Sequence, residues 1–197
     1  MPPSNQSKIR PFDPQMPAFR QEGFQALFEH WSSLRVENSI PAAASLNPRS
    51  IAPWLRNLTI MEVELPHAVR YRLAGTSVVE RMGIDPTGRN LLDMVNEDMR
   101  QAAATLFSTV STLPCAALTS HTNIASNGRA ANILSLFLPL LVPNGQMARV
   151  VSLIALQEIV DYFPPAGKVT VGSALNHHSW IDIGFGIPDD ALAAAIA

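Results

Sequence analysis

Histidine and cysteine are the side chains that most often bind metals or act as nucleophiles, and this chain has few of either. Its five histidines and one cysteine are His30, His67, His121, His177, His178 and Cys115. His177 and His178 are adjacent, but no third histidine or cysteine lies near them, whereas a protein zinc site usually has three or four ligands. The sequence therefore predicts no metal site.

The chain also lacks the short strings that mark common catalytic and nucleotide-binding sites. No H-E-x-x-H, C-x-x-C, Walker A or G-x-G-x-x-G string occurs, and no Ser-His-Asp signature stands out. Asp85, Asp93, Glu97 and Asp98 lie close together in the sequence, but turn and helix-cap roles explain them better than acid–base catalysis. We therefore expect no catalytic residues and no enzyme activity.

One stretch, YRLAGTSVVERMGIDPTGRN at residues 71–90, has two interpretations. A strand followed by a glycine and a hydroxyl-capped helix can hold a phosphate. However, only Gly75 precedes the expected helix, no lysine follows it, and the neighbouring strands suggest an antiparallel sheet. We therefore interpret Gly75 as the exit from a strand, Ser77–Glu80 as a capping box and "DPTG" as a type I turn.

The composition is that of a folded domain with few charges. The chain has 197 residues, of which 47% are hydrophobic and 15% charged, with a formal net charge of −2. This length fits one domain, and the charge gives no basic footprint for nucleic acid. Residues 1–17 lack the apolar segment of a secretion signal, and no apolar run is long enough to span a membrane. A lone cysteine cannot form an internal disulfide, so we expect a cytoplasmic protein. From the charge and the lack of a membrane-spanning run, we expect neither nucleic-acid nor membrane partners.

Apolar residues at helical spacing predict a first helix over residues 19–35. Phe24, Leu27, Phe28 and Trp31 recur at i, i+3, i+4 and i+7. This stripe either packs on the domain's own core or forms the interface of a homodimer. The second interpretation is supported by the aromatic width of the stripe and by the low charge content.

Alternating apolar residues predict five strands. Residues 58–65 and 68–75 form a plausible hairpin. The other three strands are expected at residues 115–125, 131–142 and 147–160. Asn-Gly pairs at Asn127 and Asn144 lie between them, and such pairs are typical of tight hairpin turns. Residues 161–197 show no clear core pattern, and we assign them to a C-terminal extension.

This order of elements, together with four motifs, resembles a known family. The motifs are HWSSLR (30–35), IPAAASLNPRSI (40–51), YRLAGT (71–76) and GIDPTGRNLLDM (83–94). They are similar to those of the PAS_5-type bacterial PAS domains, over roughly residues 22–160. The resemblance implies an α+β PAS-like fold, in which short helices cover one face of a five-stranded antiparallel sheet. The domain would span residues 18–160, between a tail at 1–17 and the extension at 161–197. Ala43 departs from the family, which more often has a basic residue there.

The resemblance also implies a function. PAS domains are sensory or regulatory modules that bind a small ligand or a protein partner and often act as homodimers. The alternatives are a small enzyme with its active site between the sheet and the helices, and a ligand-free interaction adaptor. A flavin photosensor of this fold needs an Asn-Cys-Arg-Phe-Leu-Gln string, which Cys115 lacks. Haem needs an axial ligand such as histidine. His121 lies on the same side of its strand as Thr119 and Asn123, but a lone histidine on a strand is usually a structural or surface residue. The sequence therefore predicts neither flavin nor haem.

The expected pocket lies between the three strands joined by the Asn-Gly turns and the helices near residues 76–94. Eight residues are predicted to line it: Tyr71, Leu73, Val79, Met82, Leu92, Met94, Phe107 and His121. Most are apolar, so an apolar or flat aromatic ligand fits better than a charged one, unless these residues are simply core. Anion recognition remains open for five arginines: Arg70, Arg72, Arg81, Arg89 and Arg129.

Overall fold

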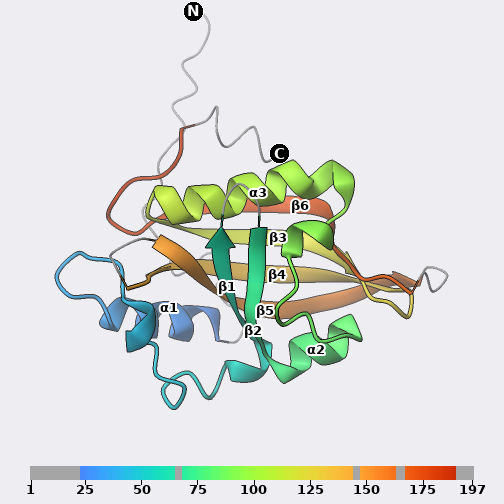
Figure 1. Ribbon diagram of the computed structural model, residues 1–197, viewed down its shortest axis with the longest axis horizontal. Coiled ribbons are helices and arrows are strands. Elements are labelled where there is room, and N and C mark those ends of the chain that lie inside the picture. The colour runs from blue at the N-terminus through green and yellow to red at the C-terminus, as the bar shows by residue number, and fades with distance from the viewer. Residues whose placement is uncertain (1–22, 65–67, 144–146, 163–166, 190–197) are drawn as a thin grey trace, which may run out of the picture.

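The computed structural model describes residues 23–64, 68–143, 147–162 and 167–189. In these residues the chain forms one six-stranded sheet with the order β2-β1-β5-β4-β3-β6, and all the neighbouring strands are antiparallel (Figure 1). The strands are β1 (Leu58–Glu64), β2 (Ala68–Ala74), β3 (Cys115–Ile124), β4 (Arg129–Leu141), β5 (Met147–Tyr162) and β6 (Thr170–Asp182). The helices are α1 (Phe24–Ser33), α2 (Thr76–Met82) and α3 (Glu97–Thr112), with short 3₁₀ turns η2 (Ala43–Ser45), η3 (Leu55–Asn57) and η4 (Leu91–Asp93). No helix in the described ranges is long and apolar enough to span a bilayer.

The fold class predicted from the sequence is confirmed, but the sheet has six strands instead of five. The sixth strand, β6, comes from the region that we assigned to the extension, and it pairs with β3 from Cys115↔Asp182 to Ile124↔Thr170. Two register shifts interrupt this pairing, one between Ser120 and His121 and one between Thr122 and Ile124. Each shift resets the two-residue period by which a strand is recognised, so β6 is hard to see in the sequence.

Both faces of the sheet are covered. Along β4, Leu134, Leu136 and Leu138 belong to the core that contains the apolar residues of α1. The alternate residue Phe137 belongs to a second core on the other face, together with residues of α2, η4 and α3. Figure 1 shows α1 on one side of the sheet and α3 on the other. An apolar run buried on both faces is the reason that β4 reads as nearly continuous hydrophobic sequence.

The aromatic stripe of α1 packs on the chain's own core. Phe24, Leu27 and Trp31 are each 0% exposed, and the Trp31 indole Nε1 donates a hydrogen bond to the Pro139 carbonyl at 2.9 Å. Phe28 is half-buried beside Trp31, with 5.9 Å between the ring centroids. The proposed dimer surface at these four residues is therefore corrected to a core contact. The homodimer itself stays a prediction.

The junction between β2 and α2 differs in detail from the capping box that we expected. Helix α2 begins at Thr76 with Gly75 as its N-cap, and no side chain caps it. Gly83 ends the helix in the left-handed region at φ 72°, where glycine is favoured. Gly75 is required for another reason, since an added Cβ would lie 2.1 Å from the Leu55 carbonyl oxygen. The chain turns from strand to helix directly against η3.

We predict that Gly75→Ala lowers the free energy of unfolding by about 3 kcal/mol or more, because η3 or α2 must move to admit one methyl group. Urea denaturation followed by circular dichroism measures this loss. Gly88→Ala is the control, because a Cβ there meets nothing within 4 Å although φ is +80°. It should lose only about 1–2 kcal/mol from the left-handed backbone. Equal losses in the two variants would contradict the close approach at Gly75.

Candidate functional site

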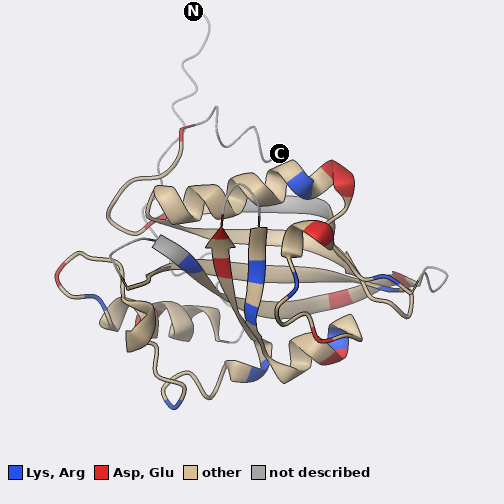
Figure 2. Ribbon diagram, in the orientation of Figure 1, with Lys and Arg blue, Asp and Glu red and all other residues tan. Residues whose placement is uncertain are grey.

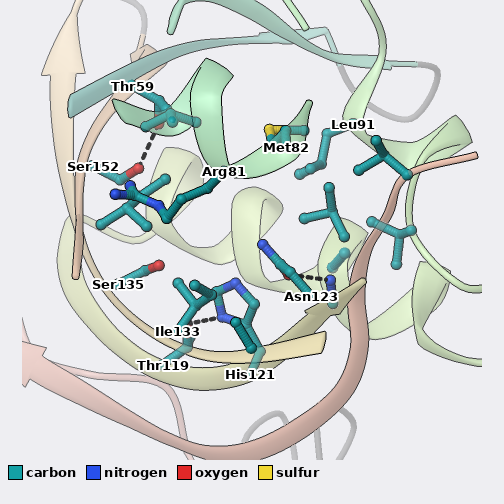
Figure 3. A pocket seen from close by; sticks show the side chains of 18 of the residues that line it. Thr59, Arg81, Met82, Leu91, Thr119, His121, Asn123, Ile133, Ser135 and Ser152 are labelled. Carbon is teal, nitrogen blue, oxygen red and sulfur yellow. Dashed lines mark hydrogen bonds between the residues drawn. The ribbon is translucent and has the colours of Figure 1, made fainter. Parts of the chain in front are cut away.

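A cavity of about 160 Å³ lies between the second face of the sheet and the helices α2 and α3. Its apolar wall comes from both layers and includes Val78, Met82, Leu91, Leu106, Phe107, Ile133 and Phe137. Figure 3 shows the side chains of Met82 and Leu91 on one side of this space and those of Ile133 and His121 on the other. The cavity is therefore bounded by sheet on one side and by helix on the other.

Polar side chains form a diagonal band across the sheet face of the cavity. Thr59 on β1 pairs in register with Ser152 on β5, and their hydroxyl oxygens are 2.6 Å apart. Thr119 on β3 pairs with Ser135 on β4, one row further along the sheet. All four are almost fully buried, and His121 follows in the next row (Figure 3). This band gives the mostly apolar cavity a polar floor.

His121 is neutral at physiological pH in this environment. Its Nδ1 lies 3.2 Å from the Thr119 hydroxyl oxygen, and apolar neighbours such as Ile133 and Phe137 line the same cavity. Burial lowers the pKa of His121 from its usual 6.5 to about 4. An uncharged imidazole can donate or accept a hydrogen bond to a ligand without adding a charge to the site.

Arg81 is the basic side chain that enters the cavity from α2. Its Nη1 donates a hydrogen bond to Asn57 Oδ1 at 2.8 Å. Its Nη2 is buried and has no hydrogen-bond partner among the described residues. Desolvation lowers the pKa of Arg81, and the nearby Glu80 carboxylate partly opposes this shift. In the view of Figure 3 the side chain extends across the cavity towards the Thr59–Ser152 side.

The other arginines that were open for anion recognition lie on the surface. Arg70 and Arg72 on β2 form ion pairs with Glu64 and Glu62, at 3.3 Å and 3.8 Å. Figure 2 shows the acidic and basic positions side by side on β1 and β2. Arg89 is also exposed, and Arg129 is an exposed residue that lines the cavity from the start of β4.

Four of the eight residues predicted to line the pocket do so: Tyr71, Met82, Phe107 and His121. The other four, Leu73, Val79, Leu92 and Met94, are not among the lining residues. At three of these positions the prediction is one residue off, because Val78, Leu91 and Val95 line the cavity in place of Val79, Leu92 and Met94. On β2, the pairs Met61↔Tyr71 and Ile60↔Leu73 leave Arg72 as an extra residue, so this bulge turns Leu73 to the opposite face.

The polar floor is the part of the site that sequence reasoning missed. Thr59, Ser135 and Ser152 were not among the predicted lining residues, and Thr119 and Asn123 were noted only as neighbours of His121. The available signal was a single hydroxyl residue inside the apolar run of each of three strands, at Thr59, Ser135 and Ser152. Asn123 Oδ1 accepts a hydrogen bond from the Gly172 amide at 2.8 Å, which ties the floor to β6.

The remaining histidines and the cysteine lie elsewhere or outside the described part. Cys115 is buried at the start of β3 and does not line the cavity, and burial raises the pKa of its thiol to about 12. His30 stacks near Trp54 on the α1 side of the sheet, with 5.8 Å between the ring centroids. His67 and the side chains of His177 and His178 lie outside what the structure describes.

A curled antiparallel sheet with helices over an interior pocket is the architecture of a PAS domain. A family model described as a PAS domain, PAS_5, matches residues 19–155. The chain therefore belongs to the PAS_5 family of PAS domains. PAS domains are typically sensory modules and are typically non-catalytic.

Solved structures with low sequence identity are similar to this chain. A fungal light-oxygen-voltage domain photoreceptor is 17% identical, covers 71% of this chain and 96% of its own, and has a TM-score of 0.44. A light-oxygen-voltage domain studied with a flavin analogue is 11% identical over 56% of this chain and 83% of its own, with a TM-score of 0.46. A PAS domain from Colwellia psychrerythraea is 13% identical over 55% of this chain and 95% of its own, with a TM-score of 0.42. No curated protein matches the chain.

We predict that the stability of this protein falls as the pH falls from 6.5 towards 4, partly because of His121. In this window the unfolded chain takes up a proton at His121, whereas the folded chain does not, so protons favour unfolding. At pH values below the pKa of His121 in the folded protein, this residue lowers the free energy of unfolding by about 3 kcal/mol. Urea denaturation of the wild type and His121→Gln, at about pH 7 and about pH 4.5, measures it.

Carboxylates titrate in both proteins, so only the difference between the two pH dependences reports on His121. Glutamine can keep a hydrogen bond to Thr119 and carries no titratable proton. The loss of stability on acidification should be smaller in the variant than in the wild type. Parallel losses would show that His121 is solvated like an ordinary surface histidine.

Proposed function

We propose that this PAS domain is a sensory or regulatory module that binds a small ligand in the cavity between the sheet and α2 and α3. The observation that carries the proposal is the cavity itself, with an apolar wall and a polar floor of Thr59, Ser152 and His121. Binding pockets for small molecules combine a largely apolar lining with a few placed polar groups. A cavity that served only as packing space would be filled by side chains.

The volume limits the size of the ligand. The cavity measures about 160 Å³, whereas sites for drug-sized ligands have about 300–1,000 Å³. An engineered apolar cavity of about 150 Å³ binds benzene. The ligand is therefore a molecule with about one ring or a short alkyl chain, and we do not propose haem or flavin.

Binding at this position can change the surface of β5. Ile154, Leu156 and Ile159 line the cavity, and β5 continues to Tyr162. Strand β1 pairs with β5 only from Arg149 to Leu153, and no other described strand covers this side of β5 beyond that point. The outer end of β5 is thus in contact with both the cavity and the surface of the molecule.

We propose that the protein acts as a homodimer through this outer end of β5. Four large apolar residues are exposed there: Leu156, Ile159, Val160 and Tyr162. Two copies of one antiparallel edge can pair with each other about a twofold axis. The low charge content, 15% of residues, supports a buried surface between copies.

The cavity proposal predicts that filling the space weakens ligand binding while the fold is kept. Ala103→Phe places a ring in the cavity from α3, and we expect it to weaken the binding of toluene by at least about tenfold. Gln101→Phe is the matched control, because it adds the same ring to the exposed face of the same helix. Ligand-observed NMR measures binding, and circular dichroism checks the fold.

Two outcomes would contradict the cavity proposal. If toluene does not bind the wild type and native mass spectrometry shows no added mass, the cavity is not a ligand site, and the adaptor that binds only protein is favoured. If Ala103→Phe binds toluene as well as Gln101→Phe, the ligand site lies elsewhere. Native mass spectrometry of the freshly purified protein is the independent check, because a stoichiometric added mass would reveal a natural ligand.

The dimer proposal predicts a particle mass of twice 21.4 kDa by light scattering. Tyr162→Asp and Val160→Asp should shift the mass to that of one chain, because a buried unpaired charge opposes the interface. Val36→Asp is the control, since Val36 is 74% exposed on the loop after α1, away from β5. A wild-type mass of one chain at all concentrations would refute the dimer.

A further inference from the structure

Arg81 differs from the surface arginines of this protein in how its guanidinium is satisfied. Arg70, Arg72 and Arg149 on the sheet are each paired with a glutamate, as in the 3.0 Å contact between Arg149 and Glu62. Arg81 has no ion pair among the described residues, and its one protein partner is the Asn57 amide oxygen at 2.8 Å. The adjacent Nη2 is buried without a partner. A buried donor without an acceptor is unfavourable, and so a polar ligand group that fills this position is favoured.

The position of Arg81 on α2 directs it into the cavity. Its neighbours Val78 and Met82 are buried in the apolar wall of the same cavity. The hydrogen bond to Asn57 fixes one side of the guanidinium, so Nη2 keeps a defined place and the side chain does not need to be ordered by the ligand. A pre-placed donor of this kind loses less entropy when it binds an anion.

The charges around the cavity favour an acid. No aspartate or glutamate occurs among the described residues that line it, whereas two arginines, Arg81 and Arg129, do. His121 is neutral at pH 7, because burial holds its pKa at about 4. Burial also raises the pKa of the Tyr71 hydroxyl, so this group is uncharged too. The nearest carboxylate on α2, Glu80, is exposed to solvent.

We propose that Arg81 Nη2 is the anion subsite of this pocket and that the ligand is a small carboxylic acid with an aromatic or short aliphatic body. The inference rests on the proposed function, since it assigns the chemistry of the same cavity. The carboxylate would bind Arg81, with the Thr59 and Ser152 hydroxyls available beside it, and the apolar body would contact Phe107 and Ile133. One open nitrogen suits a singly charged carboxylate better than a phosphate, whose additional charged oxygens need several donors.

The test compares benzoate with benzamide, because the two have nearly the same shape and differ in charge. We expect the wild type to bind benzoate at least about tenfold more tightly than benzamide, as a charge-assisted hydrogen bond would give. Titration calorimetry or ligand-observed NMR at neutral pH measures both affinities. The wild-type comparison needs no variant, so it does not depend on how well a variant folds.

Three substitutions test whether Arg81 causes the preference for benzoate over benzamide. Arg81→Gln should bind the two compounds equally, and Arg81→Lys should keep part of the preference for benzoate because the charge remains. Arg56→Gln is the matched control, since it removes an exposed positive charge from η3, next to Asn57, but does not line the cavity. Circular dichroism and thermal melting check that each variant is folded.

The outcomes separate this inference from the proposed function. If toluene binds but benzoate is no tighter than benzamide, the ligand cavity stands and the acid subsite is overturned. If the preference survives in Arg81→Gln and is lost in Arg129→Gln, the anion binds at the cavity mouth and the assignment to Arg81 is wrong. If neither toluene nor benzoate binds, both the proposed function and this inference fail.

Discussion

Strand β4 is covered by side chains on both of its faces, and this double burial determines how the rest of the molecule is arranged. Leu134, Leu136 and Leu138 face α1, while Phe137 faces the second core with α3. Burying both faces of a strand requires a layer on each side of the sheet. Helix α1 must therefore supply a wide apolar stripe to its own chain, so the stripe at Phe24 and Trp31 is core in spite of its aromatic character.

The two faces of the sheet differ in the length of their side chains, and the cavity follows from this difference. On the α1 face the strands carry leucines that fill the space. On the other face Ser135 and Thr119 are short, and the facing helix α3 presents Ala102 and Ala103. Short side chains on both layers cannot meet across a normal sheet–helix distance, so a space remains between them. Because its floor is polar, this space suits water or a ligand with polar groups better than an apolar void would.

The sequence was sufficient for α1 and for the first five strands, because each has a regular period of apolar residues. The fold class came from the resemblance of the motifs and the element order to PAS domains. It failed where the period is interrupted. The extra residue at Arg72 turns Leu73 away from Tyr71, and the two register shifts opposite β6 remove its alternation. In α2 and η4 the error was one residue, since segments of seven and three residues are too short for periodicity to fix which side faces the sheet.

The missed parts of the site have a different physical cause. A serine or threonine inside an apolar strand carries no local signal of what lies opposite it, because its environment is made by strands distant in the sequence. Thr59 and Ser152, for example, are 93 residues apart in the chain and 2.6 Å apart in space. Arg81 likewise looks like any helix-surface arginine until its burial and its open nitrogen are seen.

The segment η3 contacts both ends of α2 and lies directly before β1. The Leu55 carbonyl leaves no room for a side chain at Gly75, and Asn57 holds Arg81, so both ends of α2 contact the same short segment. The Gly75 amide also donates a hydrogen bond to the Leu58 carbonyl at 2.9 Å, at the start of β1. Strand β1 in turn pairs with β5, whose outer residues reach both the cavity and the surface. The proposed ligand at Arg81 Nη2 would therefore bind a side chain that Asn57 ties to η3, directly before the start of β1.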